Sequence, residues 1–221
     1  MGGSIRKPYL RLGGVPILKR TLTVFTQSDL FEEIILVVAA PETAFCREQI
    51  ADVLSTSSTM QVIAGGRDRQ ESVFLGLAAS RGQADDVVLI HDGVRPFVSA
   101  KVLSQCLEAA MVYGACLTAV AAYDTLKQTG DDGRIVQTLP RDAVWMAQTP
   151  QGFRLGLIRD AHRQARDEGF KGTDDGQLVE RLGQAVTIVP GSRLNIKITT
   201  PEDLQLAEAI WRYARNAPGS D

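Results

Sequence analysis

The chain has 221 residues, of which 44% are hydrophobic and 23% are charged, and its formal net charge is −2 at pH 7. These proportions are typical of a globular domain and argue against an intrinsically disordered chain. The slightly negative charge argues against non-specific binding to nucleic acid or to an anionic membrane surface. No apolar run approaches the roughly 20 residues that a membrane-spanning helix needs. We therefore expect one domain over residues 1–221, without a nucleic-acid or membrane partner.

The cysteines and the first residues bear on the cellular compartment. Cys46, Cys106 and Cys116 are odd in number and widely spaced in apolar segments. This pattern predicts reduced core thiols and not disulfides or a zinc site. The chain opens with MGGSIRKPYL, which has a basic pair but no apolar stretch of the kind found in a signal peptide. We therefore expect a cytoplasmic protein.

Helices and strands are expected to alternate through the first 121 residues. Helices are indicated by apolar residues at spacings of three and four, and strands by short aliphatic runs. In chain order the segments are a loop (1–14), a helix (16–25), a strand (33–38), a helix (41–54), a strand (61–64), a helix (71–80), a strand (87–90), a helix (100–113) and a strand (115–121). This alternation predicts an α/β fold, with a doubly wound, mostly parallel sheet in a Rossmann-like arrangement of three layers.

The alternation stops at about residues 122–148, which are polar and prone to form strands. Asp131-Asp132-Gly133 is a strong signal for a hairpin turn, so we expect a two-stranded arm that projects from the domain. Because an isolated ribbon is marginally stable in water, the arm is expected to pack on a second copy of the chain. The segments expected after the arm are a helix (155–168), a helix capped within 172–175, two strands (185–189 and 195–198), a helix from Pro201 and a frayed tail (216–221).

The strand at 87–90 ends in His91-Asp92-Gly93-Val94-Arg95-Pro96 and is expected to be buried on both faces. In open parallel sheets ligands bind beyond the carboxyl ends of the strands, which makes this turn a candidate site. Three other clusters combine cations with glycines, hydroxyls or amides: Lys7, 65–72 and 195–197. Such groups near helix starts favour anions, so together they suggest a phosphorylated or nucleotide ligand. The sequence lacks a Walker motif, a GxGxxG fingerprint and a GxSxG elbow, which argues against P-loop NTPases, dinucleotide dehydrogenases and α/β hydrolases.

Several motifs together resemble those of the 2-C-methyl-D-erythritol 4-phosphate cytidylyltransferase family. They occur in the same order as in the family and extend over nearly the whole chain. The motifs are Lys7-Pro8-Tyr9-Leu10, Gly65-Gly66-x-x-Arg69-Gln70-x-Ser72, His91-Asp92-Gly93-x-Arg95-Pro96, Thr149-Pro150-Gln151, Thr173-Asp174-Asp175 and Asn195-Ile196-Lys197. The resemblance implies a nucleotidyltransferase of the non-mevalonate isoprenoid pathway that forms a homodimer through a β-arm. The implied reaction moves CMP from CTP to the polyol phosphate, giving the CDP-alcohol and pyrophosphate. Mg²⁺ is the implied cofactor, held mainly through the CTP phosphates.

The resemblance also implies roles for individual residues. Lys7 matches the lysine that stabilises charge on the α-phosphate, and Lys197 matches the lysine near both substrates. Arg141, a further catalytic position, lies with Thr125 on the arm and would reach the substrate of the partner subunit. The nucleotide contacts match Gly66, Arg67, Ser72 and Gly93, and the sugar-phosphate contacts match Asp92, Arg95, Thr125, Thr149 and Thr173. Asp92 is expected to orient either the metal ion or a sugar hydroxyl.

The chemistry fits these residue types. The phosphate oxygen of the substrate is already anionic, so its attack on the α-phosphorus of CTP needs no protein nucleophile. The protein has to supply alignment and positive charge where negative charge gathers. His91, at the end of an aliphatic strand, is expected to be a structural, hydrogen-bonded side chain, and Asp174 is either a cap residue or a ligand.

The resemblance fails at the start of the chain. The family begins with a strand and a glycine-rich loop of the form Ala-Ala-Gly-x-Gly-x-Arg, which would lie ahead of Met1, and its proline before the lysine is replaced by Arg6. We therefore expect a natural protein that is longer at its N-terminus, with the additional strand beside residues 87–90. Two alternative functions stay open, a ribitol 5-phosphate cytidylyltransferase and a non-catalytic nucleotide-binding relative.

Overall fold

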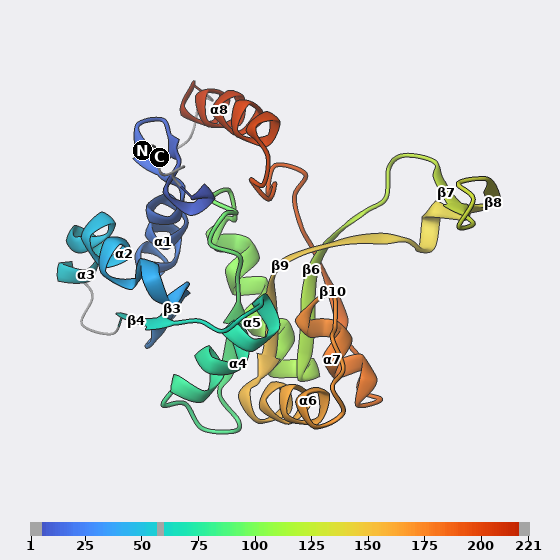
Figure 1. Ribbon diagram of the computed structural model, residues 1–221, viewed down its shortest axis with the longest axis horizontal. Helices are drawn as coiled ribbons and strands as arrows, with labels where there is room; N and C mark the ends of the chain where they lie inside the picture. The colour runs from blue at the N-terminus through green and yellow to red at the C-terminus, as the bar shows by residue number, and fades with distance from the viewer. Residues whose placement is uncertain (1–5, 57–59, 217–221) are drawn as a thin grey trace.

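The computed structural model describes residues 6–56 and 60–216, and its arrangement of helices, strands and arm is drawn in Figure 1. The α-helices are α1 (Ile17–Gln27), α2 (Thr43–Gln49), α3 (Ala51–Thr56), α4 (Arg69–Ala79), α5 (Ala100–Tyr113), α6 (Leu155–Asp167), α7 (Asp175–Arg181) and α8 (Pro201–Asn216). The strands are β1 (Arg11–Leu12), β2 (Val15–Pro16), β3 (Ile34–Val38), β4 (Met60–Ala64), β5 (Val87–Ile90), β6 (Ala115–Ala121), β7 (Leu126–Thr129), β8 (Ile135–Leu139), β9 (Trp145–Arg154) and β10 (Thr187–Pro190). Three short 3₁₀ turns are η1 (Lys7–Tyr9), η2 (Ala40–Glu42) and η3 (Arg141–Ala143).

The main sheet has four strands in the order β10-β6-β9-β5. Strands β10 and β6 are parallel, whereas β9 is antiparallel to both of its neighbours, β5 and β6. The sheet is therefore mixed, where the sequence predicted a mostly parallel one. Strand β9 accounts for the difference: its polar run Gln148-Thr149-Pro150-Gln151 is buried, so the segment lacks the aliphatic pattern of a core strand.

Helices cover both faces of this sheet, as the sequence predicted. Neighbouring residues on a strand point to opposite faces. Accordingly, Ala115 of β6 packs into a core cluster with α6 and α7, while Cys116 packs into a second cluster with α5. Strand β6 thus lies in the middle of three layers. All three cysteines are free and buried, as predicted.

The parallel pair β3–β4 forms a second, smaller sheet, and residues of α1, α2 and α3 pack against it. Over 6–56 and 60–216, β3 pairs only with β4, and β5 pairs only with β9. Strand β5 is therefore an edge strand, and it packs on both faces as predicted: Val87 and Leu89 lie against the cluster with α5, and Val88 and Ile90 lie against the cluster with α6 and α7. Its residues are only partly buried, because one edge of the strand has no partner in the described part of the chain. The additional strand expected beside it stays a prediction.

The projecting arm was predicted correctly. Strands β7 and β8 pair antiparallel from Leu126 and Leu139 onward, and the pair extends away from the helices (Figure 1). Gly133 in the turn has φ of +75°, a left-handed conformation that glycine adopts without steric penalty. At the base of the arm, the guanidinium of Arg193 lies 4.1 Å from the centre of the Tyr123 ring.

Two predicted elements differ from the structure. The helix expected over 41–54 is two helices, α2 and α3, separated at Ile50. The strand expected over 195–198 is a loop, because its backbone groups bond to the turn after β5: the Ile198 N–H donates to Val94 O, and Asn195 O accepts from Arg95. The expected tail falls mostly on 217–221, outside the described residues. In the described part of the chain, no helix is long and apolar enough to cross a membrane.

We expect Leu155→Ala to lower the free energy of unfolding by about 2–5 kcal/mol, because the change leaves a cavity in the core between α6 and the sheet. Leu155 is 2% exposed, whereas Leu206 on α8 is 52% exposed. The control Leu206→Ala should change the same quantity by no more than about 0.5 kcal/mol. Urea denaturation measures both variants, and equal losses would contradict this placement of the core.

Candidate active site

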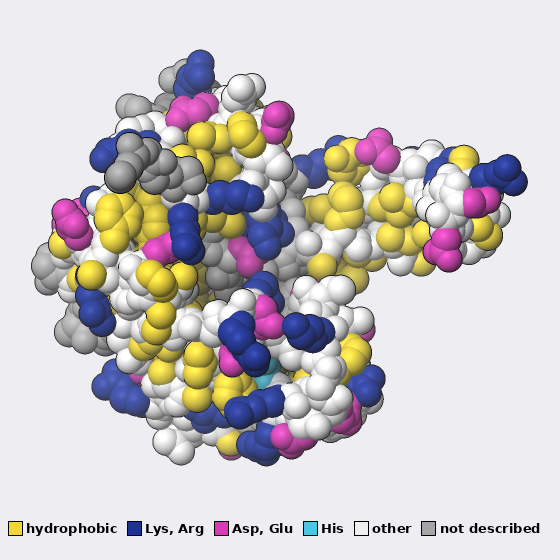
Figure 2. Space-filling model, in the orientation of Figure 1, with side chains coloured by type: hydrophobic (Ala, Val, Ile, Leu, Met, Phe, Trp, Pro, Cys, Tyr) yellow, Lys and Arg dark blue, Asp and Glu magenta, His cyan; other side chains and the backbone are white. Residues whose placement is uncertain are grey.

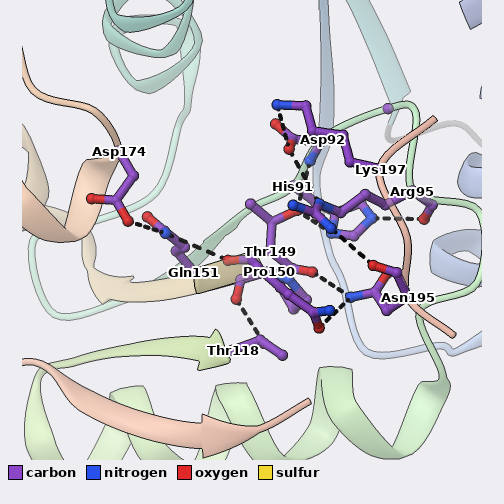
Figure 3. Close-up of polar contacts among 12 residues, drawn as sticks. His91, Asp92, Arg95, Thr118, Thr149, Pro150, Gln151, Asp174, Asn195 and Lys197 are labelled. Atoms are coloured by element: carbon purple, nitrogen blue, oxygen red, sulfur yellow. Dashed lines mark hydrogen bonds and ion pairs between the residues drawn. The ribbon is translucent and has the colours of Figure 1, made fainter. Parts of the chain in front are cut away.

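The Asp92 carboxylate lies among three cationic side chains at the end of β5. Its Oδ2 is 3.0 Å from Nζ of Lys197 and 3.3 Å from Nε of Arg95, and its Oδ1 is 3.4 Å from Nε of Arg69. We call these four residues the Asp92 cluster; Figure 3 shows Asp92, Lys197 and Arg95 turned toward one another. Burial raises the pKa of Asp92, but Lys197, and then Arg69 and Arg95, outweigh burial and hold it below its usual value.

The cluster joins three segments that are far apart in the sequence: the start of α4, the turn after β5 and the loop before α8. Arg69 is the first residue of α4, whose N-cap is Asp68, which accepts a hydrogen bond from the backbone of Glu71. Around the hollowed middle of the face drawn in Figure 2, basic and acidic side chains gather together. The turn and the loop thus bring Asp92, Arg95 and Lys197 together, as predicted.

Arg69 also contacts a second carboxylate. Its Nη2 lies 2.8 Å from Oδ2 of Asp175, the first residue of α7. The other oxygen of Asp175 lies 3.0 Å from Nε2 of His162 on α6, and both of these side chains are buried. Burial would lower the pKa of Arg69, but Asp175, and then Asp92, outweigh it and raise the pKa.

A short series of hydrogen bonds fixes the imidazole of His91 beside the cluster. His91 Nε2 lies 3.1 Å from the backbone oxygen of Arg95, which can only accept, so Nε2 carries the proton. His91 Nδ1, 3.1 Å from Thr149 Oγ1, then accepts from that hydroxyl, and the hydroxyl accepts from the backbone N–H of Asp92 at 3.0 Å. This order describes neutral histidine. His91 is therefore a structural side chain, and Thr149 is bound to the turn that carries Asp92.

The loop that carries Lys197 is held by buried polar side chains (Figure 3). Asn195 donates through Nδ2 to Thr149 O at 2.9 Å and to Gln148 Oε1 at 3.3 Å, and its own backbone oxygen accepts from Arg95 at 2.8 Å. Gln148 donates to the backbone oxygen of Ser192 at 2.9 Å. The position of Lys197 therefore depends on β9 and on the turn after β5.

Gln151 of β9 connects the sheet to the start of α7. Its Nε2 donates to Asp174 Oδ2 at 2.8 Å, and its Oε1 accepts from the backbone N–H groups of Asp175 and Gly176. Asp174 also accepts from the backbone of Gln177, so it is a helix cap, one of the two roles that the sequence left open. Thr173 donates from Oγ1 to Gln177 and is exposed.

Three of the four predicted nucleotide-contacting residues, Gly66, Arg67 and Ser72, lie in the turn before α4 and in the first turn of that helix. The Gly66 N–H donates to Ser72 Oγ at 3.1 Å, and the Ser72 hydroxyl donates to the backbone oxygen of Asp68 at 2.8 Å. Arg67 points outward and pairs with Glu71 at 3.0 Å. Gly93 lies elsewhere, at the turn after β5, where a Cβ would approach Leu18 Cδ1 to 2.9 Å. Side chains of the same segment therefore bind the backbone N–H groups of this turn: Ser72 accepts from Gly66, and Glu71 accepts from Arg67.

Three further predicted residues lie outside the network of contacts around Asp92. Lys7, in η1, has an exposed side chain that makes no ion pair with the rest of the described chain. Thr125 and Arg141 are exposed on the arm, where Arg141 donates to Tyr123 O at 3.0 Å. That Lys7 reaches a shared ligand with Lys197 stays a prediction.

Five further residues belong to the site, and none of them was predicted to have an individual role: Arg69, Asp175, Gln148, Gln151 and Asn195. Arg69 and Asn195 stand only as members of the predicted clusters 65–72 and 195–197. Arg69 and Asp175 each stand in the first turn of a helix that follows a polar loop. The helix dipole is enough to explain an acidic residue such as Asp175 at that position, whereas it disfavours a cation such as Arg69. What distinguishes Arg69 and Asp175 is their contact with each other across the fold. No local pattern in the sequence indicates this contact.

Among the described residues, no three or more histidine, cysteine, aspartate or glutamate side chains gather in a group that could hold a metal ion. The oxygens of Asp92 face three cations instead. The chain's own side chains, as far as the structure describes them, therefore do not build a metal cage around Asp92.

We expect His91 to stay neutral down to a pKa of about 4, because burial disfavours its charged form. The unfolded chain, with a histidine pKa near 6.5, then binds more protons than the folded chain between these two values. The free energy of unfolding should therefore fall as the pH falls from about 6.5 to about 4. Histidine NMR titration measures the pKa of His91. The variant His91→Gln assigns the signal, and it should also reduce the dependence of the free energy of unfolding on pH. Titration of His91 near 6.5 would be evidence against this environment.

Comparison with known proteins identifies the family. A family model described as IspD, 2-C-methyl-D-erythritol 4-phosphate cytidylyltransferase, matches residues 1–213. The protein of that name from Geobacter metallireducens is 52% identical over 212 residues, which are 95% of this chain and 91% of that protein. The crystal structure of 4-diphosphocytidyl-2C-methyl-D-erythritol synthase from Anaerococcus prevotii is 36% identical, with a TM-score of 0.86 over 96% of this chain and 92% of that one. The Francisella tularensis cytidylyltransferase structure is 33% identical, with a TM-score of 0.81 and 94% of each chain covered. The chain therefore belongs to the 2-C-methyl-D-erythritol 4-phosphate cytidylyltransferase family.

Proposed function

We propose that this chain catalyses the reaction that gives its family its name, the transfer of CMP from CTP to 2-C-methyl-D-erythritol 4-phosphate in isoprenoid precursor biosynthesis. The observation that carries the proposal is the Asp92 cluster, in which three cations share one carboxylate. Even with Asp175 included, the cations outnumber the carboxylates. Such an excess of positive charge favours a ligand that carries several negative charges.

In the proposed reaction, a phosphate oxygen of the polyol phosphate forms a bond to the α-phosphorus of CTP. The bond from that phosphorus to the bridging oxygen of the β-phosphate breaks, and pyrophosphate leaves with the electron pair. Lys197 and Lys7 would stabilise the charge that gathers on the α-phosphate, and Arg95 would hold the polyol phosphate. Fixed cations lower the barrier because they need no reorganisation during the reaction.

The remaining assignments divide between the two substrates. Backbone groups at Gly66 and Gly93, with Arg67 and Ser72, would contact the nucleotide. Asp92, Thr149 and Thr173 would contact the polyol phosphate, with Thr125 and Arg141 supplied by the arm of the partner subunit. Because the Thr149 hydroxyl lies between His91 and the Asp92 backbone, its contribution would be to orient the turn as much as to bind.

Mg²⁺ is the proposed cofactor, held mainly by the CTP phosphates, whose charge it would neutralise when bound. Asp92 does not at present offer a free carboxylate, because both of its oxygens pair with cations. Its role as a metal ligand stays a prediction. The role that its contacts support is to hold Arg69, Arg95 and Lys197 close together against their mutual repulsion.

We expect Lys197→Ala to lower kcat by about 10²–10³-fold, the usual loss when one fixed donor to the transition state is removed. The measurement is pyrophosphate release from CTP and Mg²⁺ with 2-C-methyl-D-erythritol 4-phosphate, using Lys101→Ala, an exposed lysine on α5, as the matched control. Faster turnover of ribitol 5-phosphate would favour the alternative enzyme. CTP binding by calorimetry without turnover of either polyol would favour a non-catalytic relative.

We also propose that the chain forms a homodimer through its arm. The arm strands leave large apolar side chains in solvent: Ile135 and Val136 of β8 are 62% and 66% exposed. Tyr123, Trp145 and Met146 at the base of the arm are also exposed. An isolated two-stranded ribbon is marginally stable in water, so a second arm packed on these side chains would stabilise both.

The double variant Ile135→Asp, Val136→Asp is expected to be a monomer, because it places two charges where the proposed interface buries apolar side chains. Sedimentation equilibrium of the wild type and the variant tests this. The variant Met111→Asp, Val112→Asp is the matched control, because these residues are equally apolar and exposed but lie on α5. A wild-type chain that is monomeric at micromolar concentration would contradict the proposal.

A further inference from the structure

We propose that Arg69 is a positioning residue: it ties the Asp92 carboxylate to the buried Asp175 and so leaves Lys197 available to an anionic ligand. This inference rests on the proposed function, because that ligand is taken to be a phosphate of one of the substrates. The role differs from that of Arg95 and Lys197, because Arg69 acts on the substrate through Asp92.

Arg69 has the shape for this role. Its Nε lies 3.4 Å from Asp92 Oδ1, and its Nη2 lies 2.8 Å from Asp175 Oδ2. Both nitrogens belong to one planar guanidinium, so the two carboxylates are held in a fixed relation to each other. A lysine carries one nitrogen on a flexible stem and cannot hold both in this way.

Asp175, the second carboxylate that Arg69 contacts, is held in place by buried neighbours. The Asp175 side chain is 1% exposed, and its second oxygen lies 3.0 Å from Nε2 of His162, which is equally buried. Its backbone N–H donates to Gln151 Oε1 at 3.1 Å, which fixes the start of α7 to β9. A carboxylate held from both directions in the core has little freedom to follow a moving partner.

Of the three cations around Asp92, Lys197 is the one that can exchange Asp92 for a ligand. Lys197 is 42% exposed, and its ammonium shares Oδ2 of Asp92 with Arg95, whereas Arg69 occupies Oδ1. If a phosphate draws Lys197 away, Asp92 keeps two cationic partners and is not left unpaired. Without Arg69, Asp92 would depend more on Lys197, and the lysine would be harder to draw to the substrate.

Two other roles for Arg69 predict different results. If Arg69 contacts the substrate phosphate directly, a lysine should replace it in part, and Asp175 should oppose anion binding by its negative charge. If Arg69 only stabilises the fold, its removal should lower stability but leave kcat/KM unchanged. The bridging role predicts that Asp175 assists anion binding, although its charge is negative, because it holds Arg69 in place.

The experiment compares Arg69→Gln, Arg69→Lys, Asp175→Asn and the double variant Arg69→Gln, Asp175→Asn. Arg163→Gln serves as the matched control, since Arg163 pairs with Asp160 on the surface of α6. Each single variant except the control should lower kcat/KM by about 10²-fold, the size of effect expected from a misplaced catalytic group. The loss of kcat/KM in the double variant should be no greater than the larger loss in the single variants, because both changes break the same contact between Arg69 and Asp175. Thermal unfolding of each variant shows which of them are folded.

A second readout does not depend on turnover. Calorimetric titration with inorganic pyrophosphate should give weaker binding for Asp175→Asn than for the wild type, against the direction expected from the loss of a negative charge. Tighter binding by Asp175→Asn, wild-type kcat/KM in Arg69→Lys, or losses that multiply in the double variant would each overturn the proposal. If the wild type binds pyrophosphate but has no transferase activity, the proposed function fails while this titration still decides the role of Arg69. If Arg69→Gln does not fold, Arg69→Lys and Asp175→Asn decide the question.

Discussion

The pairing of one carboxylate, Asp92, with three cations is the interaction on which the site depends. Arg69, Arg95 and Lys197 come from three separate segments and would repel one another if the carboxylate were absent. Coulomb repulsion between such close charges is substantial at the reduced dielectric of a half-buried site. Asp92 therefore keeps the cations together before any ligand arrives. A phosphate has more charge and more acceptor oxygens than a carboxylate, so it can take over cations that Asp92 has already gathered.

The fold was predictable wherever local signals mark the boundaries. Helix α5 has the predicted bounds because Ser99 caps its start and Gly114, at φ of +83°, ends it. Strand β9 was missed, because its buried polar residues are satisfied by distant partners: Thr118 donates to Pro150 O, and Asn195 donates to Thr149 O. No local pattern encodes such bonds. The error about the sheet follows directly, since β9 is the strand that runs antiparallel to its neighbours.

The site residues divide in the same way, into those that a local motif marks and those that only a distant contact marks. Asp92, Arg95 and Lys197 stand in loops with strong motifs, and the structure brings them together. Arg69 and Asp175 stand in matched motifs as well, but their importance lies in a contact between two helix starts. Lys7 had a strong motif and yet has an exposed side chain. Motifs therefore nominate candidate ligand-contacting residues, while the residues that hold these candidates in place are found from contacts.

The strengths of the individual links in this network suit their different roles. Lys197 is 42% exposed and Asp92 is 12% exposed, so solvent weakens their ion pair relative to a fully buried one, and the proposed exchange of Asp92 for a phosphate would cost less there. Arg69 is 37% exposed but Asp175 only 1%, so breaking their ion pair would leave a buried carboxylate with one partner fewer, and this contact resists exchange. If Lys197 were the buried partner and Asp175 the exposed one, Lys197 would be harder to transfer to a phosphate and Arg69 would be less firmly positioned. Burial decreases from His162 and Asp175 in the core to Lys197 at the surface, so in the proposed mechanism the contact of Lys197 with Asp92 would be the one that yields when a substrate binds.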